Sequence, residues 1–523
     1  MQKGYFATKA RLRRFRWQHF LLALFITVLP AHAKAAHAYD LQHYDLLVEP
    51  RFPDGSLALT ATVTIDNPRL ETSFSFGLNK GYSSVQVTSP ESAVTVNRAQ
   101  RSIDVLLAQP SRMLTLVFKL DGDLGKSDGD DRKIIDEQSL YLLWSDQFYP
   151  IDFNDWATVT TAIILPAGFE AIAPGRRLHT ESVGGGVRHT FTTSVPQVNY
   201  SIIADRRWTR TERTLKGIPM VTLLLPESQR FTDQILSSSA DVLRFYSDTF
   251  GAYPFEQFGF VTVSGIYARR ALSGFVAYEP AYLEKEMTTT GHDAHETALL
   301  WWGYTSHAEG PGAWQWFEGF GDYAEILYDE ARHMPHPRNF EFFRSKYLAL
   351  PAEKDLLYTE LRGNTDQALI HGKYPWLMHL VRYVVGDRRF ESGLRLVFER
   401  FRYRSLSMDE FLATLEEGAG QSLSWFRKEW LERKGVPSLA LQTEIQERGN
   451  SYEITGILEQ KGETYHLPVE IGIQTERGLR VERLNLNDQN VRFAFRSKQQ
   501  PTKVLLDPHG WLLMNKASPT SAS

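Results

Sequence analysis

Two residue types that support hydrolytic chemistry stand side by side near the middle of the chain. His295 and Glu296 begin an apolar stretch that continues to Gly303. An imidazole nitrogen can bind zinc, and a neighbouring carboxylate can act as general base on a metal-bound water. A His-Glu pair by itself occurs by chance in many proteins, so its surroundings decide what it means.

The pair matches part of a zinc-binding pattern written H-E-x-x-H. In this pattern, two histidines four positions apart share one face of a helix and bind the metal together. The chain has His295 and Glu296, but Leu299 occupies the position of the second histidine. Because a leucine side chain has no donor atom, zinc binding at this pattern needs a ligand from elsewhere.

The residues that follow the pair resemble those of a known family. Residues 301–303 are Trp-Trp-Gly, and Glu318-Gly319-Phe320 comes later with Tyr323 and Glu325. This order resembles the membrane alanyl aminopeptidase family of gluzincin zinc metallopeptidases, which has W-F/W-G after H-E-x-x-H and then a W-x-x-E-G-F-A-x-Y-x-E helix. Leu299 and Glu318 have the separation that the family has between its second histidine and its third ligand.

The resemblance implies a role for each matched residue. His295 and Glu318 would be zinc ligands, Glu296 the general base, and Glu325 a supporting residue beside the ligands. His371 lies where the family has the tyrosine that stabilises the oxyanion of the tetrahedral intermediate. A histidine can also donate a hydrogen bond there, so it stays a catalytic candidate. The implied cofactor is zinc, either retained or lost.

The resemblance also indicates where a substrate would bind. The family's G-x-M-E-N strand, whose glutamate holds the free amine of the substrate, is expected shortly before the metal helix. Residues 273–280 are the match, and they make Gly274, Tyr278 and Glu279 the substrate-binding candidates. Tyr278 falls at the position of the family's glutamate, and Glu279 lies one residue later. A shift of one residue in a strand turns a side chain to the opposite face of the sheet.

Two other histidines could replace the ligand that Leu299 lacks. His292 precedes His295 by three positions, so both could share a helical face, although His292 would approach from the opposite turn. His307 lies beyond the expected helix and could fold back from a loop. Without a replacement the site would be weak, since catalytic zinc has three protein ligands and a water. A structural interpretation also stays open, with His295 in the core and Glu318 paired with an arginine.

The likeness covers most of residues 40–515. Residues 250–255, 371–382, 425–437 and 506–508 also resemble segments of the family. It implies a multidomain α+β protein with a β-rich N-terminal domain, a thermolysin-like, mostly helical catalytic domain and a C-terminal β-sandwich. The corresponding domain bounds are 39–205, 206–435 and 436–515, followed by a polar tail over 516–523.

Hydrophobic periodicity predicts the same order of elements. Residues 57–65 and 113–120 alternate between apolar and polar types, which is typical of strands. A period near 3.6 predicts helices over about 292–303, 314–332, 339–349, 373–385, 388–401, 408–418 and 423–433. Ser407 and Glu410 form a capping box before one of them. Alternation returns in 452–458, 467–473 and 504–506, which predicts the strands of the sandwich.

Residues 1–38 predict a secretory signal peptide. A basic stretch precedes an apolar run over 20–29, and small residues before Ala33 and Ala38 offer two cleavage sites. The run is about half the length of a transmembrane helix, so we expect no membrane anchor in the mature chain. The order of basic, apolar and small residues in this segment favours a bacterial periplasm. The chain has no cysteine, so disulfides and thiolate metal sites are excluded.

Composition narrows the class of partner. The chain of 523 residues is 42% hydrophobic and 23% charged, which is ordinary for a globular protein. Its formal net charge falls from −4 to −11 without the seven positive charges of residues 1–38. Nucleic-acid binding needs clustered lysine and arginine, so an acidic mature chain argues against such a partner. A peptide or protein in the cleft is the expected partner.

Three functions remain open from these residues. The first is a secreted protein of the aminopeptidase family that is catalytically impaired, because Leu299 replaces a zinc ligand, and that binds a peptide or partner protein. The alternative is an active zinc-dependent aminopeptidase or peptidase with a substitute ligand. A second alternative is a non-catalytic scaffold of the cell envelope.

Overall fold

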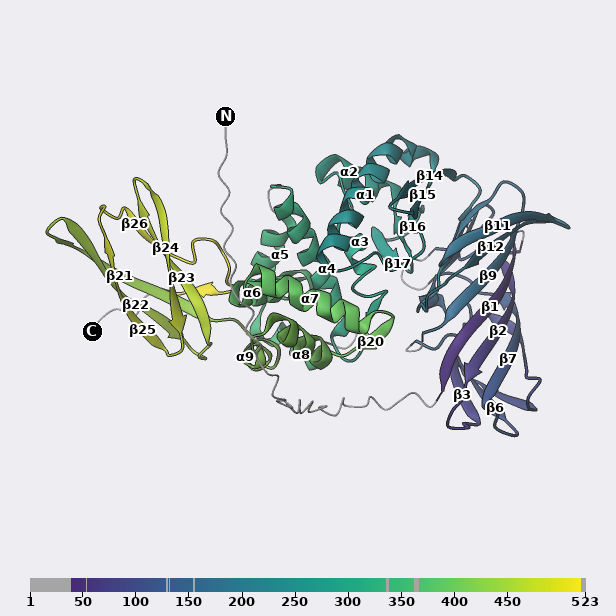
Figure 1. The fold of residues 1–523 in the computed structure, drawn as a ribbon. Helices are drawn as coiled ribbons and strands as arrows, with labels where there is room; N and C mark the ends of the chain where they lie inside the picture. Colours follow the sequence, from purple (N-terminus) through teal and green to yellow (C-terminus); the bar gives the residue numbers. More distant parts are fainter. Residues whose placement is uncertain are drawn as a thin grey trace, which may run out of the picture. The chain divides into compact units, whose positions relative to one another are not determined.

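In the computed structural model of the chain, the described residues are 39–52, 54–127, 130, 132–153, 156–334, 338–361 and 366–518. The predicted signal peptide over 1–38 lies outside them, as do residues 519–523 of the predicted tail. Within these ranges, no helix is both long and apolar enough to cross a membrane. Figure 1 shows the order of the elements along the chain.

The N-terminal region is built on long strands whose sequences alternate between apolar and polar residues. In β2 (Ser56–Asp66), every second side chain from Leu57 to Ile65 is buried. β7 (Met113–Asp123) alternates in the same way. One face of each strand therefore packs into a core while the other stays partly exposed. The strands predicted over 57–65 and 113–120 are confirmed.

These strands belong to a seven-stranded sheet with the order β11-β12-β9-β1-β2-β7-β4. Two three-stranded sheets, β3-β6-β5 and β10-β13-β8, share its hydrophobic core. The remaining strands of this region are β1 (Asp40–Arg51), β3 (Ser73–Gly77), β4 (Tyr82–Thr88), β5 (Val94–Arg98), β6 (Ser102–Leu107), β8 (Ser139–Leu142), β9 (Thr158–Leu165), β10 (Glu170–Ile172), β11 (Arg176–Val183), β12 (Gly186–Thr192) and β13 (Ile202–Asp205).

A five-stranded mixed sheet follows and borders the candidate site. Its order is β14-β15-β16-β18-β17, and β15, β16 and β18 run parallel. β17 pairs antiparallel with β18 and forms one edge of the sheet. The strands are β14 (Thr209–Leu215), β15 (Ile218–Leu224), β16 (Phe258–Thr262), β17 (Arg269–Leu272) and β18 (Phe275–Tyr278).

Helices make up the middle of the chain. They are α1 (Thr232–Thr249), α2 (Pro280–Thr289), α3 (His295–Leu299), α4 (Ala313–Ala331), α5 (Arg338–Leu348), α6 (Tyr374–Val385), α7 (Asp387–Phe401), α8 (Met408–Ala419) and α9 (Ser424–Phe426). The helices predicted over 314–332, 339–349, 373–385, 388–401 and 408–418 are confirmed within one or two residues at each end, and the capping box of Ser407 and Glu410 begins α8. The helix predicted over 423–433 is α9 followed by the π-helical turn Arg427–Leu431.

The helix predicted over 292–303 is wrong in its length, because α3 has only five residues. After Leu299 the chain continues in turns in which the Trp301 N–H donates to the carbonyl oxygen of Ala298 at 3.0 Å. Gly303 then has a φ of 136°, which is far from the helical region. The strand β19 (Ser306–Ala308) follows these turns and pairs in parallel with β20 (Arg404–Leu406).

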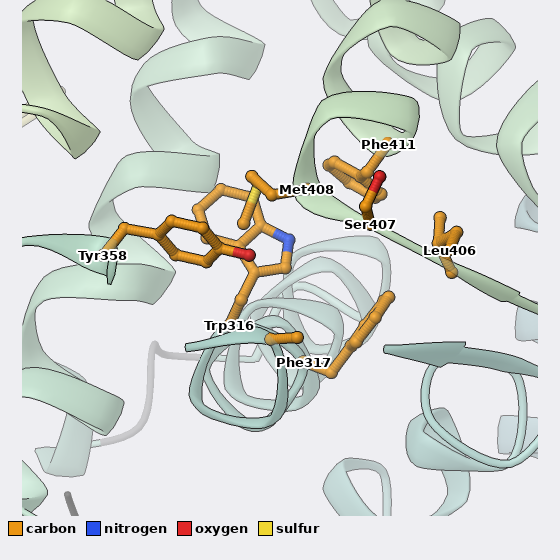
Figure 2. A pocket seen from close by; sticks show the side chains of 8 residues that line it. Trp316, Phe317, Tyr358, Leu406, Ser407, Met408 and Phe411 are labelled. Atoms are coloured by element: carbon orange, nitrogen blue, oxygen red, sulfur yellow. The ribbon is translucent and has the colours of Figure 1, made fainter. Parts of the chain in front are cut away.

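Tight aromatic packing joins α4 to α8. Trp316 and Phe317 of α4 meet Phe411 of α8 with ring centroids 5.6 and 6.2 Å apart. Figure 2 shows these side chains around a cavity of about 10 Å³, which Tyr358 and Met408 also line. A space of this size holds one water molecule at most. The start of α4 is therefore held firmly in the core, and this fixes the direction of the residues that follow it.

The C-terminal region consists of two small sheets with the orders β25-β22-β21-β27 and β24-β23-β26. Their strands are β21 (Ser438–Arg448), β22 (Ser451–Lys461), β23 (Leu467–Thr475), β24 (Gly478–Leu486), β25 (Asn490–Ser497), β26 (Lys503–Leu506) and β27 (Asn515–Lys516). Ile454, Ile471 and Phe493 pack between the sheets. The strands predicted over 452–458, 467–473 and 504–506 are confirmed, and with them the expected fold class of a β-rich region, a helical region and C-terminal β-sheets.

Candidate active site

The short helix α3 carries His295 and Glu296 into the interior of the helical region. Asp293 stands just before the helix, and its carboxylate accepts a hydrogen bond from the Glu296 N–H at 3.3 Å. Tyr278 of β18 donates a hydrogen bond of 2.6 Å to the same carboxylate. A carboxylate that accepts an N–H in the first turn stabilises the start of a helix. Asp293 therefore ties α3 to the five-stranded sheet.

The imidazole of His295 lies between two carboxylates of α4. Its Nε2 is 3.4 Å from Glu318 Oε2, and its Nδ1 is 2.9 Å from Asp322 Oδ1. Burial lowers the pKa of His295, but the two carboxylates raise it by more, so this pKa lies well above its ordinary value. The two carboxylates therefore favour the protonated form of His295.

Asp322 joins His295 to a second imidazole. Its Oδ2 lies 2.6 Å from Nδ1 of His371, which comes from a π-helical turn (Ala368–Lys373) before α6. Burial alone would raise the pKa of Asp322, but His371 and His295 lower it well below its usual range. The sequence analysis did not select Asp322. Its signal was present, since Asp322 follows Glu318 by four positions and shares its helical face.

Glu296 faces an arginine of the neighbouring sheet edge. Its Oε1 lies 3.1 Å from Nε of Arg269, at the start of β17. Arg269 also lies 3.5 Å from the carboxylate of Glu286 in α2. Burial raises the pKa of Glu296, while His295 and Arg269 lower it in part. Arg269 is a second residue that sequence reasoning missed, because only the fold brings β17 against α3.

Leu299 lies beside the ring of His295, on the side of α4. It is 6% exposed and packs toward Gly321. A Cβ atom placed on Gly321 would stand 3.1 Å from Leu299 Cδ2 and 3.1 Å from His295 Cε1, which is closer than side chains normally pack. Gly321 therefore provides the room in which the leucine side chain and the imidazole lie.

These residues line a cavity of about 950 Å³. His295, Glu296 and Leu299 form one part of its wall, and β17 forms another. The N-terminal region contributes Trp144, Phe153 and Asn199, and α4 and α5 contribute Trp314, Glu318, Asp322, Glu325, Phe342 and Phe343. A volume of this size is at the upper end of the range for ligand sites in proteins. The cavity can hold several residues of a bound chain.

Known proteins share this architecture. No protein-family model matches the chain. It is 20% identical over 352 residues to the alanine/arginine aminopeptidase of Saccharomyces cerevisiae, covering 62% of this chain and 40% of that protein. It is also 20% identical over 371 residues to the puromycin-sensitive aminopeptidase of Caenorhabditis elegans, covering 63% and 37%. The chain thus spans about two fifths of the length of these relatives.

A solved structure of an M1 zinc metallopeptidase mutant from Deinococcus radiodurans is similar with a TM-score of 0.66 and 21% identity. The alignment covers 77% of this chain and 96% of that one. The aminopeptidase relatives and this solved structure support the expected resemblance to the M1 aminopeptidase family.

The M1 zinc site can be compared with the side chains that this chain provides. Two ligand atoms bound tetrahedrally to zinc lie about 3.3–3.5 Å apart. His295 Nε2 and Glu318 Oε2, at 3.4 Å, have this spacing. The third place is taken by Leu299, whose side chain is hydrocarbon only. The chain therefore does not provide the three ligands of the M1 site, and its own residues form ion pairs there instead.

The two histidines named as substitutes have other partners in this chain. His292 Nε2 lies 3.1 Å from Asp329 Oδ1, and its ring lies against Tyr328. His307 borders the cavity, and its Nδ1 lies 2.7 Å from the carbonyl oxygen of Gly303. Among the described residues, the one group of three that could hold a metal consists of His295, Asp322 and Glu325, with ligand atoms within 4.8 Å of one another.

The three substrate-binding candidates do not line the cavity. Gly274 lies in the turn between β17 and β18 with a φ of 84°. The hydroxyl of Tyr278 is bonded to Asp293, and Glu279 caps α2 by accepting hydrogen bonds from the N–H groups of Ala281 and Tyr282. Residues 268–272, which include β17, form the cavity wall at this place.

Glu325 borders the cavity one turn after Asp322. Burial raises the pKa of Glu325 to about 7, although Arg269 and His292 act to lower it. The arrangement shows a charged cluster of histidines, carboxylates and one arginine at the floor of a large cavity, and it is this chemistry that a ligand would meet.

Proposed function

We propose that this protein binds a polypeptide in its M1 cleft and that its zinc-dependent hydrolysis is impaired. The observation that carries the proposal is the packing of Leu299 against Gly321 and the ring of His295, at the place of the second zinc ligand. Because the leucine side chain cannot bind a metal, His295 and Glu318 remain as two of the three expected zinc ligands. Two ligands hold catalytic zinc weakly. The cavity itself is retained at about 950 Å³.

A strand edge beside the cavity favours a polypeptide as the ligand. β17 is the last strand of its sheet, and its residues line the cavity. An edge strand has N–H and C=O groups that an extended chain can pair with. The carbonyl oxygen of Ala271 already accepts a hydrogen bond from the Tyr304 hydroxyl at 2.8 Å, so a bound peptide would pair with other backbone groups of β17 or displace this hydroxyl.

Metal content and peptide turnover test the proposal together. We expect the purified mature protein to hold far less than one zinc per chain after dialysis against metal-free buffer, as measured by mass spectrometry of the metal. We also expect no release of amino acids from free-amino peptides. Efficient hydrolysis that Glu296→Gln abolishes would overturn the proposal, because Glu296 would then act as the general base.

A second candidate is an active zinc peptidase with a substitute ligand. The observation that favours it is the group of His295, Asp322 and Glu325, whose donor atoms lie within 4.8 Å of one another. Glu296 would be the general base and His371 the oxyanion donor. It requires activity that a chelator removes and zinc restores, and chelator-resistant activity would exclude it.

We further propose that the protein acts outside the cytoplasm, in a bacterial periplasm. The support is the basic and apolar pattern of residues 1–38. Expression of the full chain, followed by separation of periplasmic and cytoplasmic fractions, tests this. A chain that stays in the cytoplasm at its full mass of 59.8 kDa would contradict it.

A further inference from the structure

The most exposed aromatic side chains of the described residues gather at one place. Among phenylalanine, tyrosine and tryptophan, these are Phe153, Tyr267, Trp314 and Phe342, with exposures of 36%, 82%, 55% and 52%. All four line the cavity of the candidate active site. We call these four residues the aromatic rim. Exposed apolar surface that is concentrated in this way marks a binding surface more often than scattered single residues do.

The four residues come from distant parts of the chain. Phe153 lies in the N-terminal region, Tyr267 between β16 and β17, Trp314 in the first turn of α4, and Phe342 in α5. No local pattern of the sequence places four aromatic side chains on one opening. Apolar surface in water is unfavourable, and a ligand that covers the rim removes this cost.

Contacts with neighbouring residues position two members of the rim, Tyr267 through its backbone and Phe342 through its ring. Asp130 of the N-terminal region accepts a hydrogen bond from the Tyr267 N–H at 2.9 Å and another from Arg270 at 2.7 Å. The ring of Phe342 has the ammonium group of Lys346 at 4.5 Å from its centre. Rigid aromatic residues lose little conformational freedom on binding, and this preorganisation favours affinity.

The charged floor of the cavity does not favour a free amino terminus. Glu296 is paired with Arg269, Glu318 with His295, and Asp322 with His295 and His371. The cavity wall at β17 adds Arg270 and contains no carboxylate. An α-ammonium group would therefore have to displace the partner of one of these three carboxylates, and Glu325 is the fourth carboxylate that lines the cavity.

We infer that the cleft recognises internal polypeptide segments that carry aromatic side chains, and that the aromatic rim determines this specificity. The inference rests on the proposed peptide binding and adds the class of segment that is bound. Tryptophan and tyrosine are the residues that contribute most often to the binding energy of such contacts. The bound segment places an aromatic side chain on the rim while its backbone passes along β17.

Four matched decapeptides test this with the mature protein. They share one sequence, carry fluorescein on a C-terminal lysine, and differ in a central Trp or Ala and in an acetylated or free amino terminus. Fluorescence anisotropy gives each Kd. We expect the acetylated Trp peptide to bind about tenfold more tightly than the acetylated Ala peptide. The free amine is expected to bind no more tightly than the acetylated form.

Rim variants connect the preference to these residues. Trp314→Ala and Phe342→Ala should each weaken binding of the Trp peptide about tenfold, and the Ala peptide less than twofold. Met113→Ala and Leu178→Ala are matched controls, since both side chains are about half exposed and lie outside the cavity. The melting temperature of every variant should stay within about 2 °C of the wild type, because exposed positions contribute little to folding.

Each failure has a separate meaning. Equal affinity for the Trp and Ala peptides would overturn the aromatic specificity and leave the proposed peptide binding intact. Tighter binding of the free amine would overturn the preference for internal segments. Absence of binding for all four peptides, up to millimolar concentration, would overturn the proposed function and this inference with it.

Discussion

The side chain of Leu299 lies so close to Gly321 that a Cβ atom on Gly321 would stand 3.1 Å from Leu299 Cδ2. The family pattern has an alanine where this chain has Gly321, and a histidine where it has Leu299. The two residues that differ from the family pattern, Leu299 and Gly321, lie next to each other in the folded chain. At the place of the family's second histidine, this chain has a small apolar contact between α3 and α4, and its consequences can be measured.

Restoring the histidine should restore the metal. In Leu299→His, an imidazole would stand beside His295 and Glu318, which already have the spacing of zinc ligands. We expect the zinc content to rise from far below one to about one per chain. Leu299→Asn is the control, because it removes the same hydrocarbon without adding an imidazole. Equal zinc content in both variants would mean that the rest of the site no longer accepts the metal.

Gly321→Ala should be destabilising in the wild-type background. Its Cβ would crowd Leu299 and the ring of His295, and overpacking of this kind costs about 1–3 kcal/mol. Alanine in a helix offsets about 1 kcal/mol of that cost. Urea unfolding should therefore show a net loss of about 1 kcal/mol. In the Leu299→Ala background the loss should be smaller, because only the contact with the His295 ring remains, and a loss that stays the same would show that Leu299 is not the group that is crowded.

Asp322→Asn should lower the free energy of unfolding by about 3 kcal/mol at pH 6, because it leaves two imidazoles without their shared carboxylate. The pKa of Asp322 is lowered in the folded protein, so its contribution is lost as the pH falls below about 4. The pKa of His295 is raised, so its contribution is complete below about pH 6.5 and is lost as the pH rises through the folded value.

The difference between wild type and Asp322→Asn should therefore be largest between about pH 4 and pH 6.5. Asp233→Asn is the matched control, because Asp233 forms an exposed pair with Arg213. It should change the stability by less than about 0.5 kcal/mol at every pH. A difference for Asp322→Asn that falls neither below about pH 4 nor as the pH rises above about 6.5 would contradict the ion pairs described here.

Glu279→Gln separates a structural role from a role in binding. Glu279 accepts two N–H groups at the start of α2 and does not line the cavity. We expect a loss of about 1 kcal/mol in stability, which is typical of a helix cap, and no change in the Kd of a bound peptide. Tyr267→Ala is the comparison, since it should weaken peptide binding with little effect on stability. A large change in Kd for Glu279→Gln would return this residue to the substrate site.

Much of the fold could be predicted from local pattern. The alternation of 57–65 and the helical period of 314–332 depend on the side chains of one segment, and both elements are present. The end of the helix expected over 292–303 could not be predicted in this way, because residues 298–302 are all apolar and are buried whether or not they are helical. Its end after Leu299 depends on turns and on the strand pair β19 and β20, which joins residues about 100 positions apart.

The sequence by itself indicated the resemblance to the family, the order of the elements and the leucine at the position of the second histidine. These are properties of residue types and their spacing along the chain. Only the tertiary structure decided the partners of the remaining site residues. Asp322 joins His295 to His371, Arg269 meets Glu296, and the aromatic rim assembles from four separate segments. The physical reason is that ion pairs and exposed surfaces depend on distances in space, which the spacing of residues along a chain does not set.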